Sequence, residues 1–310
     1  MTYVLATACD RRYARAALNL LGSVRRNSNI FDAVYLYDVG LTRLQVAIFK
    51  SIRGVSVIAV PDFVPHARRC WTWKPWVWCN TPGDQVLFLD AGAEVLGSLI
   101  EVREEIANHG YFVVGQFEAL ESGHTVEDVV PSDFYDTFAI PPALSAKPVI
   151  AGGVVGFRKD SDFYEHVVRD VLRYAEAGYT LGFSKHELWR NRWVNRMPNP
   201  PVRDCSYFRH DQTLLNIFFY KYIRSPVISP FEKFGAFQRN GSRGQVIWTP
   251  RLRGKGEYVR AVDYKTLGRV RNTLNPALIR LATAPSLVLE AVRATADETR
   301  ARLRRVHASP

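Results

Sequence analysis

The sequence predicts an α/β protein with a mostly parallel sheet, helices on both faces and a basic helical carboxyl-terminal extension. Short apolar runs alternate with segments of helical periodicity through the first 115 residues. No apolar run approaches the roughly 20 residues that cross a bilayer. Lysine and arginine gather toward the carboxyl end. Strands that alternate with helices are typical of a parallel sheet covered on both faces.

The expected elements follow from these patterns in chain order. Apolar, partly β-branched runs predict strands, and apolar residues at three- and four-residue spacing predict helices. The first strands are expected at 3–8, 34–37, 55–60 and 85–90, and the helices between them at 12–26, 42–52 and 73–79. A later strand is expected at 149–157, followed by helices at about 161–178 and 211–222.

Three intervening segments have irregular composition. Residues 124–148 are rich in Asp, Ser and Pro, which suggests a mobile flap, and residues 183–201 are basic and aromatic. Residues 235–256 are rich in glycine and arginine, which suits a loop that closes over phosphate. We expect one domain over 1–260 and a helical tail over 261–310.

The charge balance favours anionic partners. The chain has 41 Lys and Arg against 30 Asp and Glu, a net charge of +11, which attracts anions. Much of the excess lies in the tail, where the pattern of 276–305 predicts an amphipathic pair of helices. That pair either docks on an anionic membrane or packs on its own domain. Aromatic residues are scarce there, since only Tyr264 follows residue 260, so no nucleic-acid partner is expected.

Cysteine usage and the first residues bear on the compartment. The four cysteines form no C-x-x-C pair, which argues against a zinc site or a disulfide framework. The first nine residues lack the basic flank of a secretory signal. We expect a reduced, cytoplasmic protein, peripheral to the inner face of the membrane if the tail docks there.

Polar residues at the expected strand ends are the first candidates for a site, because ligands bind beyond the carboxyl ends of such strands. Asp90 either contacts a ribose or a cation there, or caps the next turn. Asp10 and Tyr13 either bind a base together, or Asp10 is the N-cap of the first helix and Tyr13 packs on the edge of the sheet.

Three further candidates lie elsewhere in the chain. Lys74, on a tryptophan-rich helix, is either a cation for a diphosphate or a solvated lysine. The adjacent glycines Gly152 and Gly153 indicate a bulge or a close approach. Asp211, at a helix start, is either a cap or a site residue.

Taken in order, five segments resemble a GT-A fold glycosyltransferase, nearest to glycosyltransferase family 8 and its distant relatives. The resemblance runs from about residue 3 to 225. The segments are Ala6-Thr7-Ala8-Cys9-Asp10 with Tyr13, Trp73-Lys74-Pro75, Leu89-Asp90-Ala91-Gly92, Ala151-Gly152-Gly153, and Asp211-Gln212 with Asn216. No single segment is specific, but their order and spacing are.

The resemblance implies a nucleotide-diphospho-sugar donor, most simply a UDP-sugar, and an acceptor that is a glycan, a lipid or a protein, such as a cell-envelope glycan or glycolipid. It implies a divalent cation, manganese or magnesium, and retention of configuration. By position, the resemblance places a uracil base against Ala6, Thr7, Ala8 and Asp10, with Tyr13 stacked on the ring. Lys74 would face the diphosphate, and Asp90, Ala91 and Gly92 would match the D-x-D that contacts ribose and metal. Gly152 and Gly153 would lie by the sugar, and Asp211 and Gln212 would lie at the reacting centre.

Three departures from the family pattern bear on activity. Gly92 replaces the second acid of D-x-D, Ala151 replaces an Asn, and the late motif with a metal-binding His and a phosphate-binding Lys is missing. Glu94 is one candidate substitute ligand, and Arg239 and Arg243 are candidates to neutralise the diphosphate without metal. The rival interpretations are an inactive relative that acts as a binding module and, less favoured, a nucleic-acid-binding protein.

Overall fold

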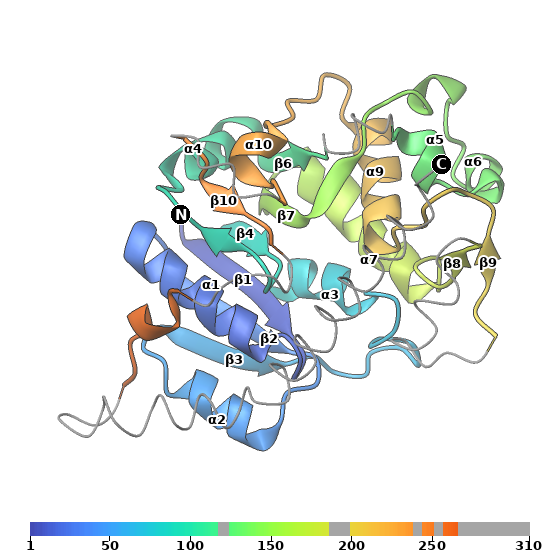
Figure 1. The fold of residues 1–310 in the computed structure, drawn as a ribbon. Helices are drawn as coiled ribbons and strands as arrows, with labels where there is room; N and C mark the ends of the chain where they lie inside the picture. Colours follow the sequence, from blue (N-terminus) through green and yellow to red (C-terminus); the bar gives the residue numbers. More distant parts are fainter. Residues whose placement is uncertain (117–123, 186–198, 238–243, 251–256, 266–310) are drawn as a thin grey trace, which may run out of the picture.

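The computed structural model describes residues 1–116, 124–185, 199–237, 244–250 and 257–265 (Figure 1). Its centre is a six-stranded sheet in the order β3-β2-β1-β4-β7-β6. The strands are β1 Tyr3–Cys9, β2 Ala33–Asp38, β3 Val55–Ala59, β4 Gln85–Leu89, β6 Tyr111–Gly115 and β7 Ile150–Arg158. The first four are parallel, whereas β7 runs antiparallel between β4 and β6. The predicted α/β class and mostly parallel sheet are confirmed.

Helices cover both faces of this sheet because its strands are apolar on both sides (Figure 1). Alternate residues of a strand point to opposite faces, so Val4 and Ala6 pack in one cluster and Tyr3 and Leu5 in another. One face carries α3 Trp73–Asn80, α7 Arg169–Glu176 and α9 Asp211–Tyr222. The other carries α1 Ala14–Asn27, α2 Arg43–Lys50, α4 Ile100–His109 and α10 Phe231–Phe234.

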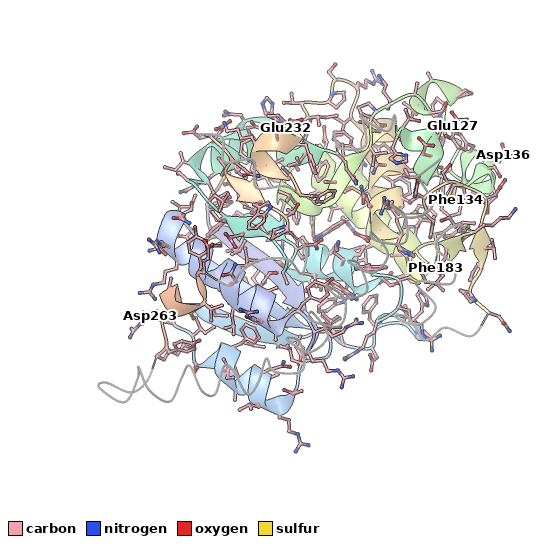
Figure 2. All side chains as sticks on the ribbon, in the orientation of Figure 1. Glu127, Phe134, Asp136, Phe183, Glu232 and Asp263 are labelled. Carbon is pink, nitrogen blue, oxygen red and sulfur yellow. The ribbon has the colours of Figure 1, made fainter. Side chains whose placement is uncertain are left out.

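The expected flap at 124–148 is packed into the core instead. It forms α5 Val126–Val129, α6 Ser132–Thr137 and the 3-10 turn η2 Pro142–Leu144. Phe134 and Phe138 are 0% and 2% exposed, and Figure 2 shows Phe134 on the α9 side of the molecule. The polar residues that suggested a flap begin short helices, as in the Thr125–Asp128 capping box.

Other differences are local. The helix expected at 161–178 begins as the π-helical turn η3 Phe163–Val168 and continues as α7. Sequence periodicity did not single out α4 or β6. Two small sheets pair strands that are distant in sequence: β5 Glu94–Val95 with β10 Ile247–Trp248, and β8 Phe183–Ser184 with β9 Val202–Arg203.

Residues 257–265 lie across α1, with the 3-10 turn η5 at Val259–Ala261. The Tyr258 N–H donates to Asn19 Oδ1 at 2.9 Å, and a Cβ on Gly22 would meet the Tyr258 carbonyl oxygen at 1.9 Å. Asp263 pairs with Arg25 and lies on the α1 side of the view in Figure 2.

The tail from residue 266 lies outside the described residues, so the expected domain boundary at 260/261 stays a prediction. Within the part of the chain that the structure describes, no helix is long and apolar enough to cross a membrane.

Candidate functional site

Three charged side chains from separate segments meet at the edge of the sheet where β4 ends. Asp90 directly follows β4, Lys74 lies in the first turn of α3, and Asp211 begins α9. Lys74 Nζ lies 3.1 Å from Asp90 Oδ1 and 3.2 Å from Asp211 Oδ2, and it donates to the Gly152 carbonyl at 3.4 Å. We call Lys74, Asp90 and Asp211 the charge cluster. An ammonium has three N–H donors, and three oxygens of the protein surround this one.

Burial sets the electrostatics of the charge cluster. The side chains of Lys74 and Asp211 are 6% and 5% exposed, whereas that of Asp90 is 46% exposed. Burial works against the charged ammonium, but the carboxylates of Asp211 and Asp90 outweigh it and raise the pKa of Lys74. Burial raises the pKa of Asp211 to about 6, although Lys74 opposes the shift. At neutral pH one ammonium therefore faces two carboxylates, and Asp90 is the accessible one.

The adjacent glycines of β7, Gly152 and Gly153, leave room for the carboxylates of Asp211 and Asp90. The Asp90 N–H donates to the Gly153 carbonyl at 2.8 Å, and a Cβ on Gly153 would lie 2.8 Å from Asp90 Oδ2. A Cβ on Gly152 would lie 3.3 Å from Asp211 Oδ2. The close approach that the sequence suggested is thus made by side chains of the site itself.

Amide side chains fix α9 on β7. Gln212 Nε2 donates to the Ile150 carbonyl at 2.8 Å and to Gln116 Oε1. Asn216 accepts from the Ile150 N–H at 2.8 Å and donates to its carbonyl at 3.2 Å. Both Gln212 N–H groups are therefore engaged, next to Asp211. Sequence reasoning missed Gln116, since no pattern marks its pairing with α9.

The end of β1 lies beside the end of β4. Ala6 pairs with Phe88, so Ala8 is level with Asp90, and Ala6, Thr7 and Ala8 are buried. Asp10 caps the turn that precedes α1, whereas the N-cap of the helix itself is Tyr13: the Asp10 Oδ1 accepts the N–H groups of Arg12 and Tyr13, and its Oδ2 pairs with the Arg12 guanidinium. Tyr13 is half-buried at the start of α1. Contacts of this segment with a base stay a prediction.

The residues around Asp90 do not form a cation site by themselves. Among the described residues, no three His, Cys, Asp or Glu side chains are grouped to hold a metal ion. The Lys74 ammonium occupies the space between the two carboxylates of the charge cluster. Ala91 is buried and Gly92 offers no side chain.

The substitute groups named from the sequence do not complete such a site in the described structure. Glu94 is 1% exposed, and its Oε2 accepts from Asn19 Nδ2 on α1 at 2.6 Å. Its carboxylate is thus committed to α1 rather than to Asp90. Arg239 and Arg243 lie outside the described residues.

Comparison with known proteins gives no family by sequence: no family model matches the chain, and no curated protein matches it. Similar solved structures exist at low identity. The WbbM bifunctional glycosyltransferase in its apo form is 13% identical, with a TM-score of 0.45 over 74% of this chain and 39% of that one. The apo form of the glycosyltransferase GlyE of Streptococcus pneumoniae TIGR4 is 16% identical, with a TM-score of 0.41 over 75% and 46%.

An active-site mutant of LgtC is 13% identical, with a TM-score of 0.44 over 91% of this chain and 95% of that one. LgtC is also described as a galactosyltransferase in complex with donor and acceptor sugar analogs. This chain spans less than half the length of WbbM and GlyE.

Proposed function

We propose that this protein is a glycosyltransferase that takes its sugar from a nucleotide-diphospho-sugar, with UDP-sugars as the donor class. The convergence of Lys74, Asp90 and Asp211 beyond β4 carries the proposal. Ligands of such sheets bind at this edge, and carboxylates accept hydrogen bonds from the hydroxyls of a sugar or ribose. The order of segments that resembles a GT-A glycosyltransferase supports the same assignment.

The proposed chemistry breaks the bond between the anomeric carbon and the diphosphate oxygen. Positive charge develops on the sugar carbon and negative charge on the leaving diphosphate, so groups that match these charges lower the barrier. The Asp211 carboxylate, kept ionised by Lys74, would stabilise the sugar cation, with Gln212 beside it. The half-exposed Asp90 would bind hydroxyls of the ribose or the sugar.

Lys74 has a different role in this proposal from the one that the resemblance implies. Its ammonium is surrounded by Asp90, Asp211 and the Gly152 carbonyl, so it would orient carboxylates rather than neutralise phosphate. The diphosphate would then be met by arginines such as Arg239 and Arg243. Any divalent cation would enter with the donor, since Mg²⁺ is commonly held by one or two carboxylates and substrate phosphates.

A thermal-shift screen tests the donor class. UDP-sugars, GDP-sugars and free nucleotides are each added with and without Mn²⁺. A ligand at 100 times its Kd stabilises the fold by about 2.7 kcal/mol. We expect UDP compounds to raise the melting temperature most and Asp90→Ala to abolish the rise. If no nucleotide raises it under either metal condition, the proposed function is wrong.

Gly153→Ala should separate donor binding from folding. The added Cβ would displace Asp90 Oδ2, which belongs to a half-exposed side chain, so the free energy of unfolding should fall by less than about 1 kcal/mol. The donor-induced thermal shift should nevertheless be lost, because Asp90 moves. Gly97→Ala is the matched control, since its Cβ would meet nothing closer than 3.7 Å. A full donor shift in Gly153→Ala would contradict this role of Asp90.

A catalytically inactive relative that binds nucleotide is the second candidate. Gly92 in place of an acid and the lack of a metal-binding group among the described residues favour it. Slow hydrolysis of the donor separates the two: a protein that is stabilised by UDP but hydrolyses no UDP-sugar, with or without Mn²⁺, is a binding module.

The finer parts of the proposal rest on the resemblance and on the tail. These parts are a relationship to glycosyltransferase family 8, retention of configuration at the transferred sugar, and a cell-envelope glycan or glycolipid as the acceptor. The helices that the sequence predicts at 276–305 would bring the enzyme to an anionic membrane surface, and this segment lies outside the described residues. Liposome flotation before and after deletion of 285–310 tests that last part, and unchanged binding would remove it.

A further inference from the structure

Two residues that precede members of the charge cluster have a backbone conformation that favours glycine. Trp71 has a φ of 58° and His210 a φ of 56°. A non-glycine residue in such a conformation costs about 1–3 kcal/mol and persists only when its surroundings hold it. Glycine would avoid this cost at both positions, so the contacts of the Trp71 and His210 side chains have to hold these backbone conformations in place.

The two side chains contact each other. Their ring centroids are 4.8 Å apart with the planes tilted by 33°. His210 is 5% exposed and also meets the rings of Phe183 and Phe208 edge-on. Figure 2 shows Phe183 on the same side of the molecule as α9. The histidine ring is therefore held from several sides, and the tryptophan ring rests on it.

Hydrogen bonds join the same two segments a second time, through Thr180 of a third segment. Thr72 Oγ1 and Thr180 Oγ1 are 2.6 Å apart, and His210 Nδ1 lies 3.0 Å from the Thr180 carbonyl oxygen. Burial lowers the pKa of His210 to about 4, so its ring is neutral at physiological pH. Because a carbonyl only accepts, Nδ1 carries the proton of this bond. We call Trp71, Thr72, Thr180 and His210 the clasp.

The clasp contacts the backbone next to both members of the Lys74–Asp211 ion pair. The Trp71 carbonyl accepts the Lys74 N–H at 2.9 Å in the first turn of α3, and His210 directly precedes Asp211 at the start of α9. The ring contact therefore sets how closely the two helix starts approach. Functional groups need placement to within about 0.5 Å, and the 3.2 Å separation of Lys74 Nζ and Asp211 Oδ2 depends on that approach.

We propose that Trp71 and His210 are positioning residues whose ring contact holds Lys74 against Asp211. Neither side chain is placed at the reacting atoms. The consequence for turnover rests on the proposed function, whereas the consequence for the ion pair does not. Two measurements therefore test the proposal.

The first measurement follows the Asp211 carboxyl by ¹³C NMR titration and needs no substrate. Lys74 and Asp90 are the charged groups that act on it, while Arg209, Lys74 and Arg203 act on His210. Lys74 lowers the pKa of Asp211. If Lys74 moves away from Asp211, the midpoint of the Asp211 titration should therefore rise, by about one pH unit. Trp71→Ala and His210→Gly should both show this rise, and Trp71→Phe, which keeps a ring, should stay near the wild-type value.

The variants differ in their effect on folding. His210→Gly removes the ring but relieves the backbone, so it stays testable if Trp71→Ala does not fold. Trp76→Ala is the matched control: Trp76 lies on α3, the helix that follows Trp71, and stacks on Phe63 at 5.8 Å. Midpoints in Trp71→Ala and His210→Gly that equal the wild-type value, or an equal rise in Trp76→Ala, would overturn the proposal.

The second measurement is hydrolysis of the UDP-sugar that gives the largest thermal shift. Small misplacement of reacting groups costs about 100-fold in rate, so kcat should fall by about that factor in Trp71→Ala and His210→Gly, with KM within about threefold. A fall in affinity with unchanged kcat would also overturn the proposal. If the wild-type protein acts on no nucleotide-sugar, the proposed function fails, and the titration alone decides whether the clasp positions Lys74.

Discussion

Replacing Lys74 with methionine should lower the free energy of unfolding by about 3–5 kcal/mol at neutral pH, the usual cost of removing one partner from a buried ion pair. The variant leaves the Asp211 carboxylate, whose side chain is 5% exposed, without its ammonium and still beside Asp90. Urea unfolding at pH 7.5 measures the loss. Donor-induced stabilisation should disappear as well, because both carboxylates lose their orientation.

A double variant provides the control for this loss. In Lys74→Met with Asp211→Asn the buried charge is gone, so most of the lost stability should return while donor hydrolysis does not. The loss in Lys74→Met alone should also shrink at pH 5, where Asp211 takes up a proton. A single variant as stable as the wild type at pH 7.5 would show that Lys74 is not the counter-ion of Asp211.

Asp211→Asn should reduce turnover of the UDP-sugar about 100- to 1,000-fold, the range for losing one positioned electrostatic group. It should also flatten the pH dependence of stability. Burial raises the folded-state pKa of Asp211 from 3.8 to about 6, so the folded protein holds this proton more tightly than the unfolded chain. The stability due to this proton is complete below about pH 4 and is lost as pH rises through 6.

The loss amounts to about 3 kcal/mol from one group, at 1.36 kcal/mol for each pKa unit. In denaturant unfolding, the stability of Asp211→Asn relative to the wild type should therefore rise by about 2.4 kcal/mol between pH 4 and pH 7. Asp10→Asn is the control, because that carboxylate caps a turn at the surface. Parallel pH curves for wild type and Asp211→Asn would contradict the buried, titrating Asp211.

Local patterns in the sequence were sufficient for the elements that carry the site. The expected helix at 211–222 is α9 Asp211–Tyr222, and the expected strand at 85–90 ends at Leu89, one residue before Asp90. The strand is almost continuously apolar and the helix carries several aromatic residues, so burial and local propensity agree in both. The same agreement explains why β1 and α3 lie within a residue or so of their expected bounds.

Tertiary contacts were beyond such patterns. Nothing local shows that the Lys74 ammonium is enclosed by Asp90, Asp211 and the Gly152 carbonyl, because these atoms belong to segments that meet only in the fold. Asp10 caps the turn before α1 rather than the helix itself. The strain at His210 was equally invisible, since histidine carries no turn signal of its own.

The segment that lies over α1, residues 257–265, has a consequence for how this chain folds during synthesis. Tyr258 and Asn19 are partners from opposite ends of the described chain, and Tyr264 pairs with Ile52. On a ribosome, α1 emerges long before residues 257–265 are made, so the surface of α1 that they cover stays exposed to solvent for most of translation. Shortened versions that keep residue 265 should express as the parent does, whereas those that stop at 256 should aggregate.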